Sequence, residues 1–168
     1  ELSGADLRNA DLTNASVYCD LRGADLREAN LHDADLTEAN LSKVNLRKAD
    51  LSDTNLRETN LCGVNLNFSD LKSANLVQAD LSGGNLRGAD LTGANLKFAD
   101  LTDTNLRHAV LTDAYLRESS LNNSDFTRAV LREAELPTGD TLQNANLTEA
   151  DLQGQDLRGE DLSGAILE

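Results

Sequence analysis

Residues 24–43 read ADLRE-ANLHD-ADLTE-ANLSK, four consecutive blocks of five with a leucine at the centre of each block. The period continues in both directions, and every central residue of the chain is leucine except Val17 and Phe126. The residue two places before the leucine is mostly small, and the residue between them is mostly Asp or Asn. A five-residue period would spread the leucines around the whole circumference of a helix, so the pattern excludes an amphipathic helix.

An extended backbone explains the pattern, because residues two apart point to one side and the residue between them points to the other. The small residue and the leucine then face inward, and Asp or Asn faces outward. The remaining two positions are largely Arg, Lys, Thr, Ser, Glu, Asp and Gly, and they have to turn a corner. Each block therefore predicts one side of a polygon.

These blocks spell an A(D/N)LXX motif, and the sequence resembles the pentapeptide-repeat family over essentially its whole length. The resemblance implies an all-β fold, a right-handed quadrilateral β-helix with four repeats per coil and about eight coils. We expect a single solenoid over residues 1–168, with a one-residue deletion within 18–20 and a one-residue insertion within 137–141. In one inward column we expect Val44 and Val64 to overfill their places and Gly84 to leave its place unfilled.

The composition narrows the class of partner. With 15 Lys and Arg against 29 Asp and Glu, the formal charge of −14 disfavours direct binding to nucleic acid or to an anionic membrane surface. The sequence contains no long apolar run that would span a membrane. The compartment stays open: the cytoplasm is slightly favoured, but a sequence that starts at Glu1 and contains no Met is compatible with a removed periplasmic or thylakoid-lumen targeting peptide.

No catalytic, cofactor or metal motif is present, so we predict that the chain is not an enzyme. His32 and His108 fall on different faces, and Cys19 and Cys62 are predicted to be free thiols. Asp50, Asp70 and Asp90 stack in one outward column that could hold a cation. We favour a structural role for this column, because each Asp can accept a backbone N–H at its corner and Lys72 lies nearby.

One corner is basic despite the net charge. We expect its cations to pair with outward Asp residues one coil away rather than to bind nucleic acid. They are Arg27, Arg47, Lys48, Arg87, Arg107 and Arg128.

The strongest departures from the motif lie near the C-terminal end. Val110, Tyr115 and Val130 stand where Asp or Asn is usual, and Phe98 lies at a corner one coil before Tyr115. Outward apolar residues of this kind predict a protein-interaction surface. The insertion, Pro137, Thr138, Gly139 and Asp140 followed by Thr141, is expected to protrude beside it as a small loop.

Two functional hypotheses follow. The first is a non-enzymatic structural or protein-interaction module with an unknown protein partner. The alternative, implied by the family's fluoroquinolone-resistance members, is a DNA mimic that modulates DNA gyrase or topoisomerase; a charge of −14 is about 60% of that of a duplex of similar length. The outward Ile166 and its neighbour Leu167 also suggest a homodimer through one end of the solenoid.

Overall fold

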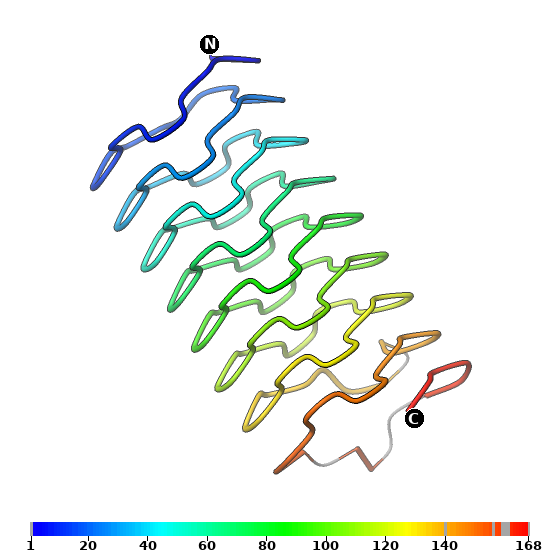
Figure 1. Cartoon of the computed structure of the whole chain (residues 1–168). Coiled ribbons are helices and arrows are strands. Elements are labelled where there is room, and N and C mark those ends of the chain that lie inside the picture. Colours follow the sequence, from blue (N-terminus) through cyan, green and yellow to red (C-terminus); the bar gives the residue numbers. More distant parts are fainter. Residues whose placement is uncertain (1, 140, 156, 159–161, 168) are drawn as a thin grey trace.

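The computed structural model describes residues 2–139, 141–155, 157–158 and 162–167. These residues form a straight rod of stacked coils, with the N-terminus at one end and the C-terminal segment at the other (Figure 1). Within this part of the chain there is no helix, and the strands are reduced to single parallel bridges, one for each outward residue. The expected all-β fold is confirmed.

The bridges define the size of a coil. Through the middle of the rod each outward residue pairs with the residue 20 positions further on, from Asp20 with Asn40 to Tyr115 with Glu135, so four five-residue sides complete one coil. The offset is 19 where a pair spans residues 18–20, as for Asp6 with Asp25. It is 21 where a pair spans residues 137–141, as for Asp125 with Asn146.

The corners explain the preference for Asp or Asn in every repeat. The side-chain oxygen of the outward residue accepts the backbone N–H two residues later, as Asp50 Oδ1 does from Ser52 N at 2.9 Å. The second corner residue has a left-handed backbone, with φ of 58° at Asp53. The backbone N–H of the following residue donates a hydrogen bond to the carbonyl of the leucine three positions earlier, which closes the turn (Thr54 N to Leu51 O, 3.3 Å). An aspartate or asparagine is therefore a turn-forming residue here, whatever its charge.

The interior consists of stacked leucines and small residues. The leucines from Leu21 to Leu121 and the central Phe126 are all fully buried, and each such side chain contributes about 1.5–3 kcal/mol. Where the small residue carries a hydroxyl, it donates to a leucine carbonyl, either of the preceding coil, as Thr54 Oγ1 does to Leu31 O at 2.7 Å, or of the same turn, as Ser69 Oγ does to Leu66 O at 2.7 Å. These buried polar groups are thus satisfied without interrupting the leucine columns.

The expectation that Gly84 leaves a void is wrong. A Cβ built on Gly84 would lie 3.3 Å from Val64 Cγ1, 3.2 Å from Leu86 Cδ1 and 2.8 Å from the Leu81 carbonyl oxygen. The larger side chain of Val64 therefore occupies the space above the glycine. A large residue in one coil and a small one in the next compensate for each other.

The insertion also differs from expectation. Pro137 is buried rather than protruding, and Thr138 is the exposed residue of the segment. Beyond it Gly139 adopts a φ of 92°, and its carbonyl accepts a hydrogen bond from Thr141 N at 2.9 Å. Asp140 lies outside the described residues. The segment adds one residue to a coil while its proline stays packed against the rod.

We predict that Gly84→Ala lowers the free energy of unfolding by about 1–3 kcal/mol, because the added methyl overpacks the column. Val64→Ala should restore part of that loss in the double variant, since it removes the methyl that faces Gly84 but not the close approach to the Leu81 carbonyl oxygen, although Val64→Ala alone is destabilising. Chemical denaturation of the four proteins measures the coupling. Additive effects of the two substitutions would contradict the packing described here.

Candidate functional surfaces

The stacked coils turn the sequence into four faces, each named here by its outward column. The Asn face carries Asn45, Asn65, Asn85 and Asn105; the Asp face Asp50, Asp70 and Asp90, then Val110 and Val130; the Tyr face Asn55, Asn75, Asn95, Tyr115 and Glu135; and the fourth face Asn40, Asn60, Asp80, Asp100 and Ser120. Any site must be built from these columns and from the corners between them.

The aspartates of the Asp face and two of the apolar departures from the motif share one column. Asp90 bridges to Val110, and Val110 bridges to Val130, so the Asp column continues directly into two valines. Lys72 Nζ lies 2.7 Å from Asp70 Oδ2 and 3.1 Å from Asp90 Oδ2, and it neutralises part of the column. With the corner hydrogen bonds, these contacts explain the aspartates without a metal ion.

The electrostatics of this column favour the charged carboxylates. Partial burial raises the pKa of Asp90, but hydrogen bonds from the Thr92 hydroxyl and backbone, together with Lys72, outweigh it and leave the pKa below its usual value. Burial likewise raises the pKa of Asp50, but the hydrogen bonds from Ser52 lower it by more, so the pKa lies below its usual value. At the N-terminal end the hydrogen bonds from Arg8 lower the pKa of Asp6 to about 2.

The Tyr face holds an exposed aromatic pair. The side chain of Tyr115 is 40% exposed and that of Phe98 is 53% exposed. The Lys97 ammonium lies 5.3 Å from the centroid of the Tyr115 ring, within the range of a cation–π contact. Lys97, which precedes Phe98 in the sequence, therefore places a positive charge against the Tyr115 ring at the surface.

A hollow adjoins Tyr115 where the insertion joins the rod. Its volume is about 390 Å³, and its walls are Arg117, Glu118, Glu135, Leu136, Pro137 and Thr138. Arg117 Nε lies 2.9 Å from Glu135 Oε2 across it. The insertion thus contributes a recess rather than a projecting loop. Neither Lys97 nor this recess was expected from the sequence, because stacking positions by columns shows neighbours but not the space between their side chains.

The sequence-predicted interaction residues do not all meet. Val110 and Val130 are partly buried neighbours on the Asp face, whereas Tyr115 and Phe98 belong to the Tyr face and to the corner after it. The turn at Thr112 and Asp113 separates the two groups. Pro137 and Thr138 line the recess next to Tyr115, while Gly139 is not among its lining residues.

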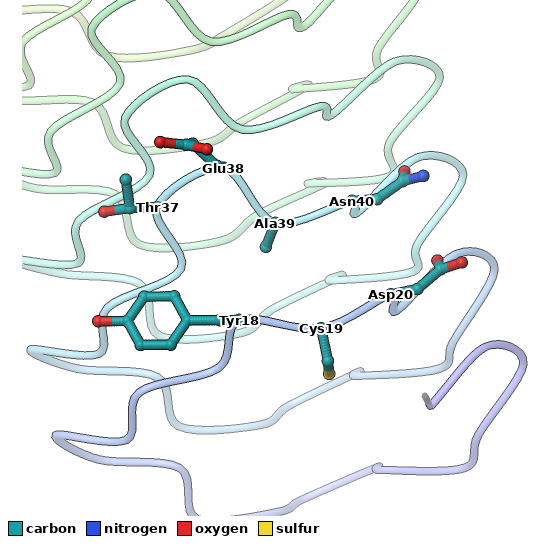
Figure 2. Close-up of a pocket in the computed structure, with 7 residues that line it drawn as sticks. All are labelled: Tyr18, Cys19, Asp20, Thr37, Glu38, Ala39 and Asn40. Carbon is teal, nitrogen blue, oxygen red and sulfur yellow. The ribbon is translucent and has the colours of Figure 1, made fainter.

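A second hollow lies at the deletion near the N-terminus. Its volume is about 500 Å³, and Figure 2 shows the seven residues that line it. Tyr18 and Asp20 point in opposite directions there, and Cys19 points to the same side as Ala39. The Tyr18 hydroxyl donates to Asp35 Oδ2 at 2.6 Å, and this bond raises the pKa of Tyr18. The functional groups diverge, so the hollow brings no reactive set together.

One cluster of ligand-type side chains was missed by the sequence analysis. His32, Asp33 and Asp53 each offer one atom within 4.8 Å of the others, because Asp53 stacks above Asp33. All three are at least partly exposed, and His32 Nδ1 donates to the Ser52 carbonyl oxygen at 3.1 Å. We interpret the trio as a surface hydrogen-bonding cluster. The cysteines are free, with Cys62 exposed and Cys19 partly buried.

The C-terminal apolar pair is exposed, with 51% of Ile166 and 55% of Leu167 accessible. Ile166 is nevertheless paired on one side, because it bridges to Asn146 in the preceding coil. Association through this end stays a prediction.

Together, the five-residue period and the 20-residue coil define a solenoid repeat protein. The family model of pentapeptide repeats matches the chain in eight copies, and the matched ranges together cover residues 1–107, 109–137 and 142–168. The chain belongs to the pentapeptide-repeat family, and its fold is the right-handed quadrilateral β-helix. No curated protein sequence gives a significant match.

Three solved structures are similar to this chain. A pentapeptide repeat protein of the Arabidopsis thaliana thylakoid lumen is 34% identical over 59% of this chain and 69% of its own, with a TM-score of 0.57. HetL, which is involved in heterocyst differentiation regulation in the cyanobacterium Nostoc sp. strain PCC 7120, is 34% identical over 98% and 84% of the two chains, with a TM-score of 0.48. A trypsin-treated variant of QnrB1, a plasmid-mediated fluoroquinolone resistance protein, is 19% identical over 96% and 85%, with a TM-score of 0.66.

Among the described residues, none lies in a helix long and apolar enough to cross a bilayer.

The lowered pKa values predict a stability that depends on pH. Because the folded-state pKa lies below the unfolded value, these carboxylates stabilise the fold above about pH 4, and that contribution is lost as the pH falls towards 2. We expect the thermal midpoint to be level from pH 7 to about 5 and then to decrease.

The matched variant is Asp50→Asn with Asp90→Asn, which keeps the oxygen that accepts the corner N–H, as Asn30 does from His32 N at 3.0 Å. Its thermal midpoint should decrease less on acidification. If repulsion within the Asp column dominated instead, the wild-type midpoint would rise between pH 5 and 4, and the variant would be more stable than wild type at pH 7.

Proposed function

We propose that this chain is a non-catalytic interaction module that binds a protein partner through the Tyr face and the corner after it. The observation that carries the proposal is the pair of exposed aromatic side chains, Tyr115 and Phe98, beside the recess at the insertion. Exposed aromatic residues next to a recess with a polar rim are typical of the energetic centres of protein interfaces.

The composition of the column supports this choice. Three coils of the Tyr face carry Asn55, Asn75 and Asn95, which satisfy the corner hydrogen bond, before Tyr115 takes the same place. The tyrosine cannot accept that bond with its ring, so its presence has no explanation in the turn. Phe98 likewise replaces the polar Gln78 of the preceding coil at a corner exposed to solvent. Both residues place apolar area at exposed positions that the preceding coil fills with Asn or Gln.

The gyrase alternative has weaker support. A DNA mimic needs a negative surface along the rod, and the basic corner interrupts it with arginines on adjacent coils. The likeness to QnrB1, at 19% identity, extends to the fold alone. We expect the protein to leave gyrase supercoiling unchanged at micromolar concentration. Inhibition of supercoiling, or rescue of the enzyme from a fluoroquinolone, would replace the proposal by the alternative.

The proposal is tested by site-specific photo-crosslinking in the cells that produce the protein. A photoreactive phenylalanine at Tyr115 or Phe98 should crosslink to one discrete protein. The same group at Asn75 or Gln78, which occupy the same columns two and one coils earlier, should not.

The variant expected to lose binding is Tyr115→Asn with Phe98→Gln. It carries the residue types found at Asn75 and Gln78 in the same columns, so it should preserve the melting temperature. It should remove the crosslinked product formed from a photoreactive group at Thr138, which lines the same recess. Equal crosslinking from Asn75 and Tyr115, or a product unaffected by the double variant, would contradict the assignment of this surface.

A further inference from the structure

The basic corner follows the Asn face, diagonally across the rod from Phe98. Of the 15 Lys and Arg residues of the chain, it carries Arg8, Arg27, Arg47, Lys48, Arg87, Arg107 and Arg128. The four coils in its middle contain no carboxylate on the Asn face or at this corner, whose positions are Arg47, Lys48, Asn67, Phe68, Arg87, Gly88, Arg107 and His108. A molecule of charge −14 thus has a local strip of positive charge.

An arginine at this corner is neutralised where its own repeat or the next coil supplies a carboxylate within reach. Arg27 pairs with Asp25, two residues earlier, with Nη2 2.6 Å from Oδ2. Arg47 and Arg87 follow Asn45 and Asn85 instead, which offer no charge. Neither guanidinium forms an ion pair with any carboxylate in the described ranges, although both side chains are exposed. Pairing with outward Asp residues one coil away was expected for this corner, and for these two arginines that expectation is wrong.

Other cations of the corner are partly engaged. Lys48 Nζ lies 3.6 Å from Glu28, and Arg107 Nη1 lies 3.1 Å from Asp125. These two contacts mark the limits of the strip, because acidic side chains resume beyond them in both directions. The available positive charge is therefore concentrated on Arg47 and Arg87, which are two coils, or about 10 Å, apart.

Phe68 lies between these two arginines. Its ring rests on Gly88 in the next coil, where an added Cβ would come within 2.6 Å of Phe68 Cδ1. The ring is nevertheless 52% exposed, and its backbone has a φ of 58°, a conformation that the fold would satisfy more easily with Asn or Gly. The corner thus combines two unpaired guanidinium groups with one apolar surface fixed between them.

We propose that the basic corner binds an extended acidic segment of a protein partner, with carboxylates on Arg47 and Arg87 and an apolar side chain on Phe68. In an extended chain of polyproline II conformation, residues three apart lie on the same side and are separated by about 9 Å, which is close to the spacing of the two arginines. Guanidinium groups bind carboxylates in a planar, two-pronged geometry, so the pairing is directional as well as electrostatic.

A short acidic peptide fits better than a nucleic acid. The strip spans about three coil steps, or roughly 14 Å, which covers only about four phosphates of a strand. A longer polyanion would meet Glu28 and Asp25 at one end of the strip and Asp125 and Glu149 at the other. This surface is separate from the Tyr face, so it goes beyond the function proposed above and can fail without affecting it.

The test uses fluorescence anisotropy with a labelled peptide that has glutamate at every third position and tyrosine between. We expect binding at about 50 mM salt that weakens strongly at about 500 mM. Arg47→Asn with Arg87→Asn should weaken it at least about tenfold. Asn67 occupies the same column, so asparagine is compatible with the fold at this corner. Phe68→Asn should weaken binding to the tyrosine peptide but not to one with glycine in its place.

The matched control is Arg22→Asn with Arg57→Asn, which removes the same charge from other corners and should leave binding unchanged. Equal weakening by the two double variants would overturn the proposal, because it would show a general charge effect. So would tighter binding of an oligothymidylate than of the peptide. A salt-sensitive dimer in sedimentation that Arg47→Asn with Arg87→Asn abolishes would replace the partner by a second copy of this chain.

Discussion

The structure depends on one repeated constraint, the parallel hydrogen bonds that join each coil to the next. Leu46 N donates to Asn65 O at 2.8 Å, and Asn65 N donates to Val44 O at 3.0 Å. This pairing brings residues 20 apart into contact, and the same alignment recurs in every coil. As a result, the leucines stack in continuous buried columns and the outward residues stack in straight columns on the surface. The deletion and the insertion change the offset locally without breaking the pairing.

Function in such a molecule has to come from departures from the repeat motif on the outer surface, because the buried leucines and small residues are nearly the same in every coil. Asp and Asn are equivalent for the corner, since either accepts the backbone N–H, but they differ in charge. The choice between them therefore sets the electrostatics at no cost to the turn. Asp25 neutralises Arg27, whereas Asn45 leaves Arg47 available. Tyr115 gives up the corner bond altogether, which makes it the clearest surface specialisation on the Tyr face.

Much of this was readable from the sequence. The period gave the inward and outward columns, and the departures at Tyr115 and Phe98 could be seen without coordinates. The compensation between Val64 and Gly84 could not, because it depends on side-chain volumes across two coils. The buried state of Pro137 and the recess beside it depend on how an inserted residue packs, for which the repeat offers no precedent. The unpaired arginines had a sequence signal, Asn-Leu-Arg in place of Asp-Leu-Arg. That signal can be interpreted only when the distances from each guanidinium group to the surrounding carboxylates are known.

The most direct test of this account is disulfide trapping between columns, in a Cys19→Ser, Cys62→Ser background. Thr92→Cys with Thr112→Cys joins corner residues one coil apart, about 5 Å between Cα atoms, and should form an intramolecular disulfide on mild oxidation. Thr92→Cys with Arg107→Cys or with Arg117→Cys joins neighbouring corners and should not. Comparable crosslinking in all three variants, or crosslinking only in the second or third, would contradict the 20-residue coil on which every surface described above depends.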